Sequence, residues 1–167
     1  NGTLNTSGTY STNLTNVGLT VSDGGTLNVL YRCNLDEVNI AAGATVNIDA
    51  STTIAGNLTL ADGVHLTGQT LSLQGDLTTP GHAVVENYVQ IYHNSTSSDT
   101  ITLSGNLVLG SVQPYGTSPV LTIPAGSNVS LERFSSASGV SVKVAGVLDI
   151  TGGYSNFDSS TITIQSG

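Results

Sequence analysis

The chain has 167 residues and a net charge of −8, because eleven acidic side chains outnumber three basic ones. Nucleic acid and anionic membrane surfaces require clustered Lys and Arg, so three scattered bases exclude both as partners. Charged residues make up only 8% of the chain, and no apolar run is long enough to insert into a membrane as a helix.

Residues 1–18 form the least apolar stretch of the chain. Leu4, Tyr10, Leu14 and Val17 are separated there by Asn, Thr, Ser and Gly. We expect an extended N-terminal arm or an irregular first turn over these residues, followed by one folded unit over residues 19–167. Hydrophobic residues make up 38% of the chain, and their regular pattern argues against disorder.

From residue 19 onward, one short pattern recurs. Each copy reads apolar-x-apolar, then two or three small residues including Gly, then apolar-x-apolar. Copies begin at Leu19, Val38, Leu58, Ile101, Leu121, Val142 and Ile162. Their spacing is 19, 20, 43, 20, 21 and 20 residues, and a degenerate copy near Leu77–Gly81 divides the longest interval. A repeat of about 20 residues is typical of solenoid proteins.

This repeat predicts an all-β fold, a right-handed parallel β-helix (β-solenoid) of about eight turns with about 20 residues each. The alternation is a strand pattern, and the Gly that follows supplies the positive φ of a tight corner. An antiparallel sandwich is the alternative, because its strands also recur every 8–12 residues or so. Two buried ladders are expected: Leu19/Val38/Leu58/Ile101/Leu121/Val142/Ile162 and Val21/Ile40/Leu60/Leu103/Ile123/Val144/Ile164.

Two segments interrupt the repeat. Asn94–Asp99 and Gln113–Gly116 are rich in small polar residues or contain Pro and Gly, and we expect them to form loops that project from the rod. Insertions in solenoids often carry binding.

Several copies resemble the right-handed β-helices of bacterial and archaeal surface proteins, of the filamentous-haemagglutinin-like and autotransporter-adhesin-like type. The clearest are Val38–Ile48 and Leu121–Leu131, and the similarity extends over residues 19–167. The resemblance implies a secreted or cell-surface protein that acts in adhesion or matrix building. It supplies no catalytic residue.

Enzymes of the pectate-lyase type share this architecture and use clustered Asp residues to bind calcium or to hydrolyse. Here Asp23 and Asp62 occupy equivalent corners two turns apart, with Ala42 between them. The adjacent Asp36 and Glu37 point their side chains apart on a strand. An acidic column is therefore not expected.

The remaining titratable residues show no catalytic pattern. His65, His82 and His93 lack the spacing of metal ligands, and Arg133 beside Glu132 is interpreted as a surface ion pair. We predict no catalytic residue, no metal site and no cofactor, and therefore no enzyme activity.

One outward position of each turn is mostly threonine: Thr20, Asn39, Thr59, Thr78, Thr102, Thr122, Lys143 and Thr163. We interpret this column as a ladder whose hydroxyls and amides hydrogen bond from turn to turn and stabilise the rod. Ice binding is the alternative function of a threonine column. Lys143 and an irregular neighbouring column argue against the flat face that ice binding requires.

The single cysteine, Cys33, excludes an intrachain disulfide, and we expect a small buried side chain there. The Asn-x-Ser/Thr pattern occurs six times. The acceptors in polar stretches are Asn1, Asn5, Asn13 and Asn94, which are candidate glycosylation sites in a secreted protein.

The two ends of the predicted rod lack an amphipathic helix that would cap them, whereas freestanding solenoids need caps. We expect assembly surfaces at Leu4, Tyr10 and Leu14 on one end and at Ile162 and Ile164 on the other, through which copies stack head to tail. The predicted function is a structural subunit of an extracellular filament or surface matrix, with further copies and glycans as partners. The alternatives are a fragment of a surface adhesin that binds glycan or host, an ice-binding protein, and a polysaccharide lyase or hydrolase.

Overall fold

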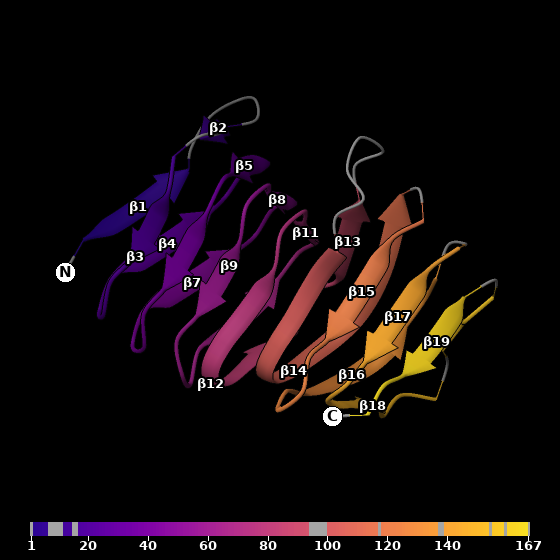
Figure 1. Ribbon diagram of the computed structural model, residues 1–167. Helices are drawn as coiled ribbons and strands as arrows, with labels where there is room; N and C mark the ends of the chain where they lie inside the picture. The colour runs from indigo at the N-terminus through magenta and orange to yellow at the C-terminus, as the bar shows by residue number, and fades with distance from the viewer. Residues whose placement is uncertain are drawn as a thin grey trace.

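A computed structural model describes residues 2–6, 12–14, 17–93, 100–116, 118–136, 139–153, 155–158 and 160–166. These residues form nineteen strands and no helix, and every pairing between the strands is parallel. The strands progress along the rod from β1 at one end to β19 at the other (Figure 1), and each stacks on a strand of the next turn, as β1 does on β4 and β17 on β19. The predicted parallel β-solenoid is confirmed.

Each turn contributes a strand segment to each of three faces. The first face consists of β1 (Thr3–Thr6), β4 (Thr26–Val29), β7 (Thr45–Ile48), β10 (His65–Gly68), the second half of β12 (Leu77–Val85), the middle of β14 (Thr100–Gly116), the start of β16 (Asn128–Phe134) and β18 (Val147–Ile150). Seven parallel pairings connect these segments. The solenoid therefore has about seven turns from first to last, close to the eight expected.

The other two faces follow the same order. The second face consists of β2 (Thr12–Leu14), β5 (Cys33–Leu35), β8 (Thr52–Ile54), β11 (Leu71–Leu73), β13 (Val89–His93) and the ends of β14 and β16. The third face consists of β3 (Leu19–Val21), β6 (Val38–Ile40), β9 (Leu58–Leu60), the starts of β12 and β14, β15 (Val120–Ile123), β17 (Ser141–Val144) and β19 (Thr161–Ile164).

The core is one continuous apolar column inside the three faces. Inward residues alternate with outward ones along each strand, and the inward side chains of the middle turns are fully buried. On the third face, the predicted ladder is offset by two residues within β14. Leu77 pairs with Leu103 in the next turn, whereas Ile101 pairs with Leu121 in the turn after. Apolar side chains still stack on apolar side chains, because a shift of two residues keeps each on the same side of the strand.

Polar side chains on the outside hydrogen bond between neighbouring turns, but the predicted threonine column is interrupted, because Thr78 pairs with Ser104 instead of Thr102. On the first face, Asn47 Nδ2 donates to Asn28 Oδ1 and Asn28 Nδ2 donates to Asn5 Oδ1, each over 2.7 Å. On the third face, the Thr78 hydroxyl donates to Oγ1 of Thr59 over 3.4 Å. These contacts join neighbouring turns without ionic groups, which suits a chain with few charges.

One predicted loop is a strand. Gln113–Gly116 belongs to β14 and pairs in register with Gln90–His93 of β13. The alternation continues through this segment, since Val112 and Pro114 are inward and buried while Gln113 and Tyr115 face outward. The prediction is wrong because Pro and Gly favour turns in general, whereas Pro114 occupies a buried inward position of a strand. The other predicted loop, Asn94–Asp99, lies outside the described residues.

Candidate functional site

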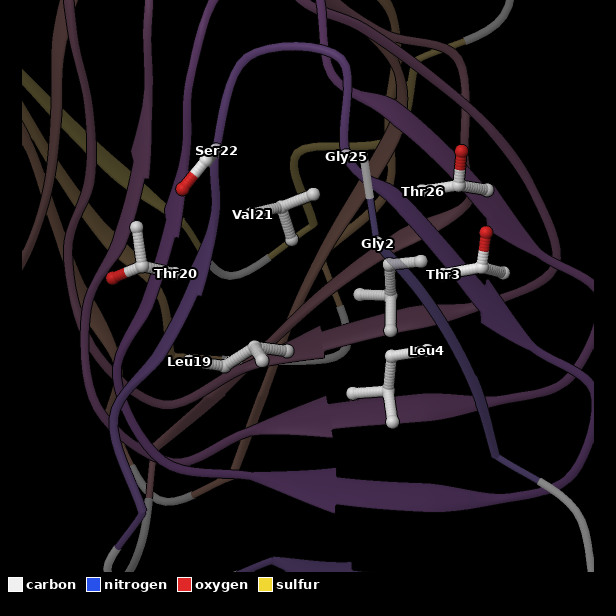
Figure 2. Close-up of a pocket in the computed structure, with 10 residues that line it drawn as sticks. Gly2, Thr3, Leu4, Leu19, Thr20, Val21, Ser22, Gly25 and Thr26 are labelled. Atoms are coloured by element: carbon white, nitrogen blue, oxygen red, sulfur yellow. The ribbon is translucent and has the colours of Figure 1, made fainter.

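The N-terminal end of the solenoid opens into an apolar hollow of about 300 Å³. Figure 2 shows Leu4 of β1 pointing toward Leu19 and Val21 of β3 across this opening, while Thr3 and Thr20 point away from it. Leu4 pairs with the buried Leu27 in the next turn yet is itself 42% exposed. The opening is therefore the end of the core column, with no turn above it among the described residues.

The C-terminal end is open in the same way. A hollow of about 400 Å³ is lined mainly by apolar side chains of β18 and β19 and the residues beneath them. Ile162 is 46% exposed and Ile164 is 75% exposed, although their partners in the preceding turn, Val142 and Val144, are buried. These two isoleucines occupy core positions that the described residues leave uncovered.

The second face is partly covered at this end. The ring of Phe157 stacks on the buried ring of Phe134, with the centroids 4.8 Å apart. Asn156 pairs with Ser135 beside this stack. The open apolar surface at the C-terminal end therefore belongs mainly to the first and third faces, where β18 and β19 lie.

The predicted assembly residues fall at these two ends wherever the structure describes them. Leu4, Ile162 and Ile164 are exposed core positions, and Leu14 of β2 is half-buried against the core. Tyr10 lies outside the described residues. Sequence reasoning missed three further members of the ends, Leu19, Leu148 and Ile150, which were assigned only to the repeat and which line the two hollows.

The candidate glycosylation residues are only partly described. Asn5 is exposed on β1 and its side-chain oxygen accepts the hydrogen bond from Asn28. The hydroxyl of Thr6, the next residue, is buried and accepts from the backbone N–H of Leu30. The backbone of Asn13 lies in β2. Asn1 and Asn94 lie outside the described residues.

Two acidic residues accept hydrogen bonds from backbone N–H groups of another turn. Asp62 Oδ1 accepts from the N–H of His82 in the next turn over 2.7 Å. Asp76 accepts from the N–H of Thr102 over the same distance. These contacts satisfy two backbone donors, so Asp62 and Asp76 each have a structural role between neighbouring turns.

The remaining polar residues singled out from the sequence lie apart. Glu37 accepts from the side-chain amide of Asn39 over 3.5 Å, and the exposed His65 contacts Glu86 over 3.1 Å. Within the described ranges, no group of three or more His, Cys, Asp or Glu could hold a metal ion, and no helix is long and apolar enough to cross a membrane.

Comparison of the chain with protein-family models, with curated proteins and with solved structures found no match in any of the three. The candidate site therefore rests on the geometry of the two ends.

Proposed function

We propose that this chain is a secreted structural subunit that stacks head to tail into an extracellular filament or surface matrix. The observation that carries the proposal is the match between the two ends. Each end exposes core positions of the first and third faces, and the strands at both ends run in the same direction around the rod because every pairing is parallel.

The register of the repeat defines how a second copy would fit on the third face. Val142 and Val144 pair with Ile162 and Ile164 one turn later. If a second copy is placed one further turn along, its Leu19 and Val21 lie against these two isoleucines. Apolar side chains then contact apolar side chains. Burying an isoleucine contributes about 1.5–3 kcal/mol, and the edge strands gain backbone partners.

The first face continues in the same stack. Leu148 and Ile150 of β18 take the positions that Val129 and Leu131 hold in the preceding turn. Leu4 and Thr6 of the second copy then lie against them. Because the two contacting surfaces differ, this contact is heterologous and propagates into a filament instead of closing into a dimer.

Composition and resemblance support an extracellular place for such a subunit. The surface consists largely of hydroxyls, amides and backbone, with 8% charged residues in the chain. The repeat resembles those of filamentous-haemagglutinin-like and autotransporter-like adhesins. A segment of a surface adhesin is the second candidate, while ice binding and polysaccharide cleavage have no described surface or cluster that favours them.

Paired variants at the two ends test the proposal. Ile164→Asp places a charge in the C-terminal contact, and Thr163→Asp places the same charge one residue away on the outward side, because Thr163 pairs with the exposed Lys143. Leu4→Asp and the outward Thr3→Asp form the matched pair at the N-terminal end. Sedimentation velocity and electron microscopy at rising concentration report assembly.

We expect the unchanged chain and both outward variants to form rods with an axial repeat of about 38 Å, because each copy stacks eight strand segments on the first face, about 4.8 Å apart. Each inward variant alone stays monomeric, and an equimolar mixture of Ile164→Asp and Leu4→Asp gives dimers only, because each retains one intact end. Dimers of Leu4→Asp alone would mean that like ends meet, which contradicts head-to-tail stacking. A chain that stays monomeric at every concentration would reject the filament and favour the adhesin.

A further inference from the structure

The outward side chains of the second face become longer partway along the rod. In the earlier turns, one outward column carries the short polar side chains of Asn34, Thr53 and Ser72. The same column continues with Gln90 of β13 and Gln113 of β14. Longer side chains with amide groups therefore replace short ones in two neighbouring turns.

Tyrosines flank these glutamines. Tyr88 and Tyr92 lie two residues before and two residues after Gln90, and Tyr92 pairs with Tyr115 in the next turn. The three rings are 37%, 36% and 51% exposed, respectively. Tyr92 and Tyr115 stack with their ring centroids 5.7 Å apart and their planes 26° from parallel. We call Tyr88, Gln90, Tyr92, Gln113 and Tyr115 the tyrosine platform.

Hydrogen bonds fix the direction of both amides. The Tyr88 hydroxyl donates to Oε1 of Gln113, and the Ser72 hydroxyl donates to Oε1 of Gln90 over 3.3 Å. With each amide oxygen engaged by a neighbouring hydroxyl, the N–H groups of the two glutamines are the donors left for a ligand. The platform therefore combines aromatic rings with oriented amide donors.

The size and charge of the platform select the kind of ligand. Tyr88 and Tyr92 span about 13 Å along the strand, and the two turns lie about 5 Å apart. A stable protein complex buries about 800 Å² on each partner, which is far more than this footprint. The platform contains no charged side chain, and Arg133 lies at its margin through its pairing with Ser111. A small, neutral and polar ligand fits these properties.

We propose that the tyrosine platform binds a neutral oligosaccharide. A sugar ring presents C–H groups on its face and hydroxyls at its edge. Tyr92 and Tyr115 offer ring surfaces and polar hydroxyl tips, while Gln90 and Gln113 donate to sugar hydroxyls. The platform lies on the side of the rod and includes no residue of either end, so this proposal does not depend on filament assembly.

The test must separate ligand binding from sheet stability, because a tyrosine pair on neighbouring strands also stabilises a sheet. The probes are hexasaccharides of β-1,4-glucose, β-1,4-N-acetylglucosamine and α-1,6-mannose. Binding is followed by tyrosine fluorescence, which is direct because the chain contains six Tyr and no Trp, and by saturation-transfer NMR. Tyr31→Ala is the matched control, since Tyr31 is 46% exposed and lies outside the platform.

We expect saturable binding of at least one hexasaccharide and a loss of affinity of tenfold or more in Tyr115→Ala. Tyr31→Ala keeps the original affinity, and Gln113→Leu weakens binding with the stacked rings still in place. Circular dichroism melts identify any variant that has lost the fold. If Tyr115→Ala has lost it, Tyr115→Phe, which keeps the ring, is compared with the unchanged chain instead. Binding that Tyr115→Ala leaves unchanged, or no binding at millimolar sugar, overturns the proposal.

Discussion

Asn28 donates a hydrogen bond from Nδ2 to Oδ1 of Asn5, 2.7 Å away in the preceding turn. Its own Oδ1 accepts from Asn47 over the same distance. The two contacts run parallel to the rod axis on the first face, and they connect three successive turns. An amide suits this position because it donates on one side and accepts on the other.

Replacing the central member of this ladder should destabilise the first turns. Asn28→Ala removes two hydrogen bonds at once, and a net value of about 1 kcal/mol each gives a loss of about 1–2 kcal/mol in the free energy of unfolding. Urea unfolding followed by circular dichroism measures the change. Asn39→Ala is the control, because Asn39 also faces outward but its side-chain amide donates to Glu37, two residues away in the same turn. Equal losses in both variants would contradict the ladder.

Gly68 allows two turns to approach at the end of β10. Its φ is +122°, and an added Cβ would collide with the carbonyl oxygen of Ile48. That oxygen accepts a hydrogen bond from the N–H of Gln69 over 2.8 Å. The close approach is therefore part of the regular hydrogen bonding between neighbouring turns.

Gly68→Ala should therefore cost about 3 kcal/mol, at the upper end of single substitutions. Gly63→Ala is the matched control, because its φ of +77° is also positive but nothing lies within 4 Å of an added Cβ. Left-handed strain alone costs about 1–2 kcal/mol. Urea unfolding measures the free energy of unfolding of both variants. If Gly68→Ala lowers it no more than Gly63→Ala does, the collision is rejected.

The repeat could be predicted from the sequence because it depends on local alternation and a constant period. Leu19, Val38 and Leu58 stack as predicted, since each turn repeats the same inward positions. The offset within β14 could not be predicted, because it depends on which of two equivalent inward residues, Ile101 or Leu103, pairs with Leu77.

The candidate sites depended more on three-dimensional register. Ile162 and Ile164 could be named as candidate assembly residues because they belong to the last copy of the pattern. The tyrosine platform could not be predicted, because the Pro and Gly within Gln113–Gly116 favour a loop and so separate Tyr115 from its strand. The pairing of Tyr92 with Tyr115 joins residues 23 positions apart and becomes visible only once β13 and β14 are aligned.

Because of Cys33, the free energy of unfolding is expected to fall at alkaline pH. Its side chain is fully buried on the second face, in register with the buried Thr52 of the next turn. Burial raises the pKa of the Cys33 thiol above its ordinary value of 9.0, because the thiolate is poorly solvated in the core. The folded chain therefore keeps the thiol proton at a pH where the unfolded chain releases it.

The sign of the effect follows from proton binding. Above pH 9 the unfolded state binds fewer protons at Cys33 than the folded state does, so the free energy of unfolding falls as pH rises, until the pH passes the folded-state pKa. Below that window the thiol contributes no pH dependence. Cys33→Ala removes this contribution. Urea unfolding gives the free energy of unfolding of both chains from pH 7 to 10.5. The difference between the two chains isolates the contribution of Cys33, because both contain the same tyrosines. A thiol reagent should modify native Cys33 only on unfolding, and rapid modification of the folded chain would contradict the burial on which the prediction depends.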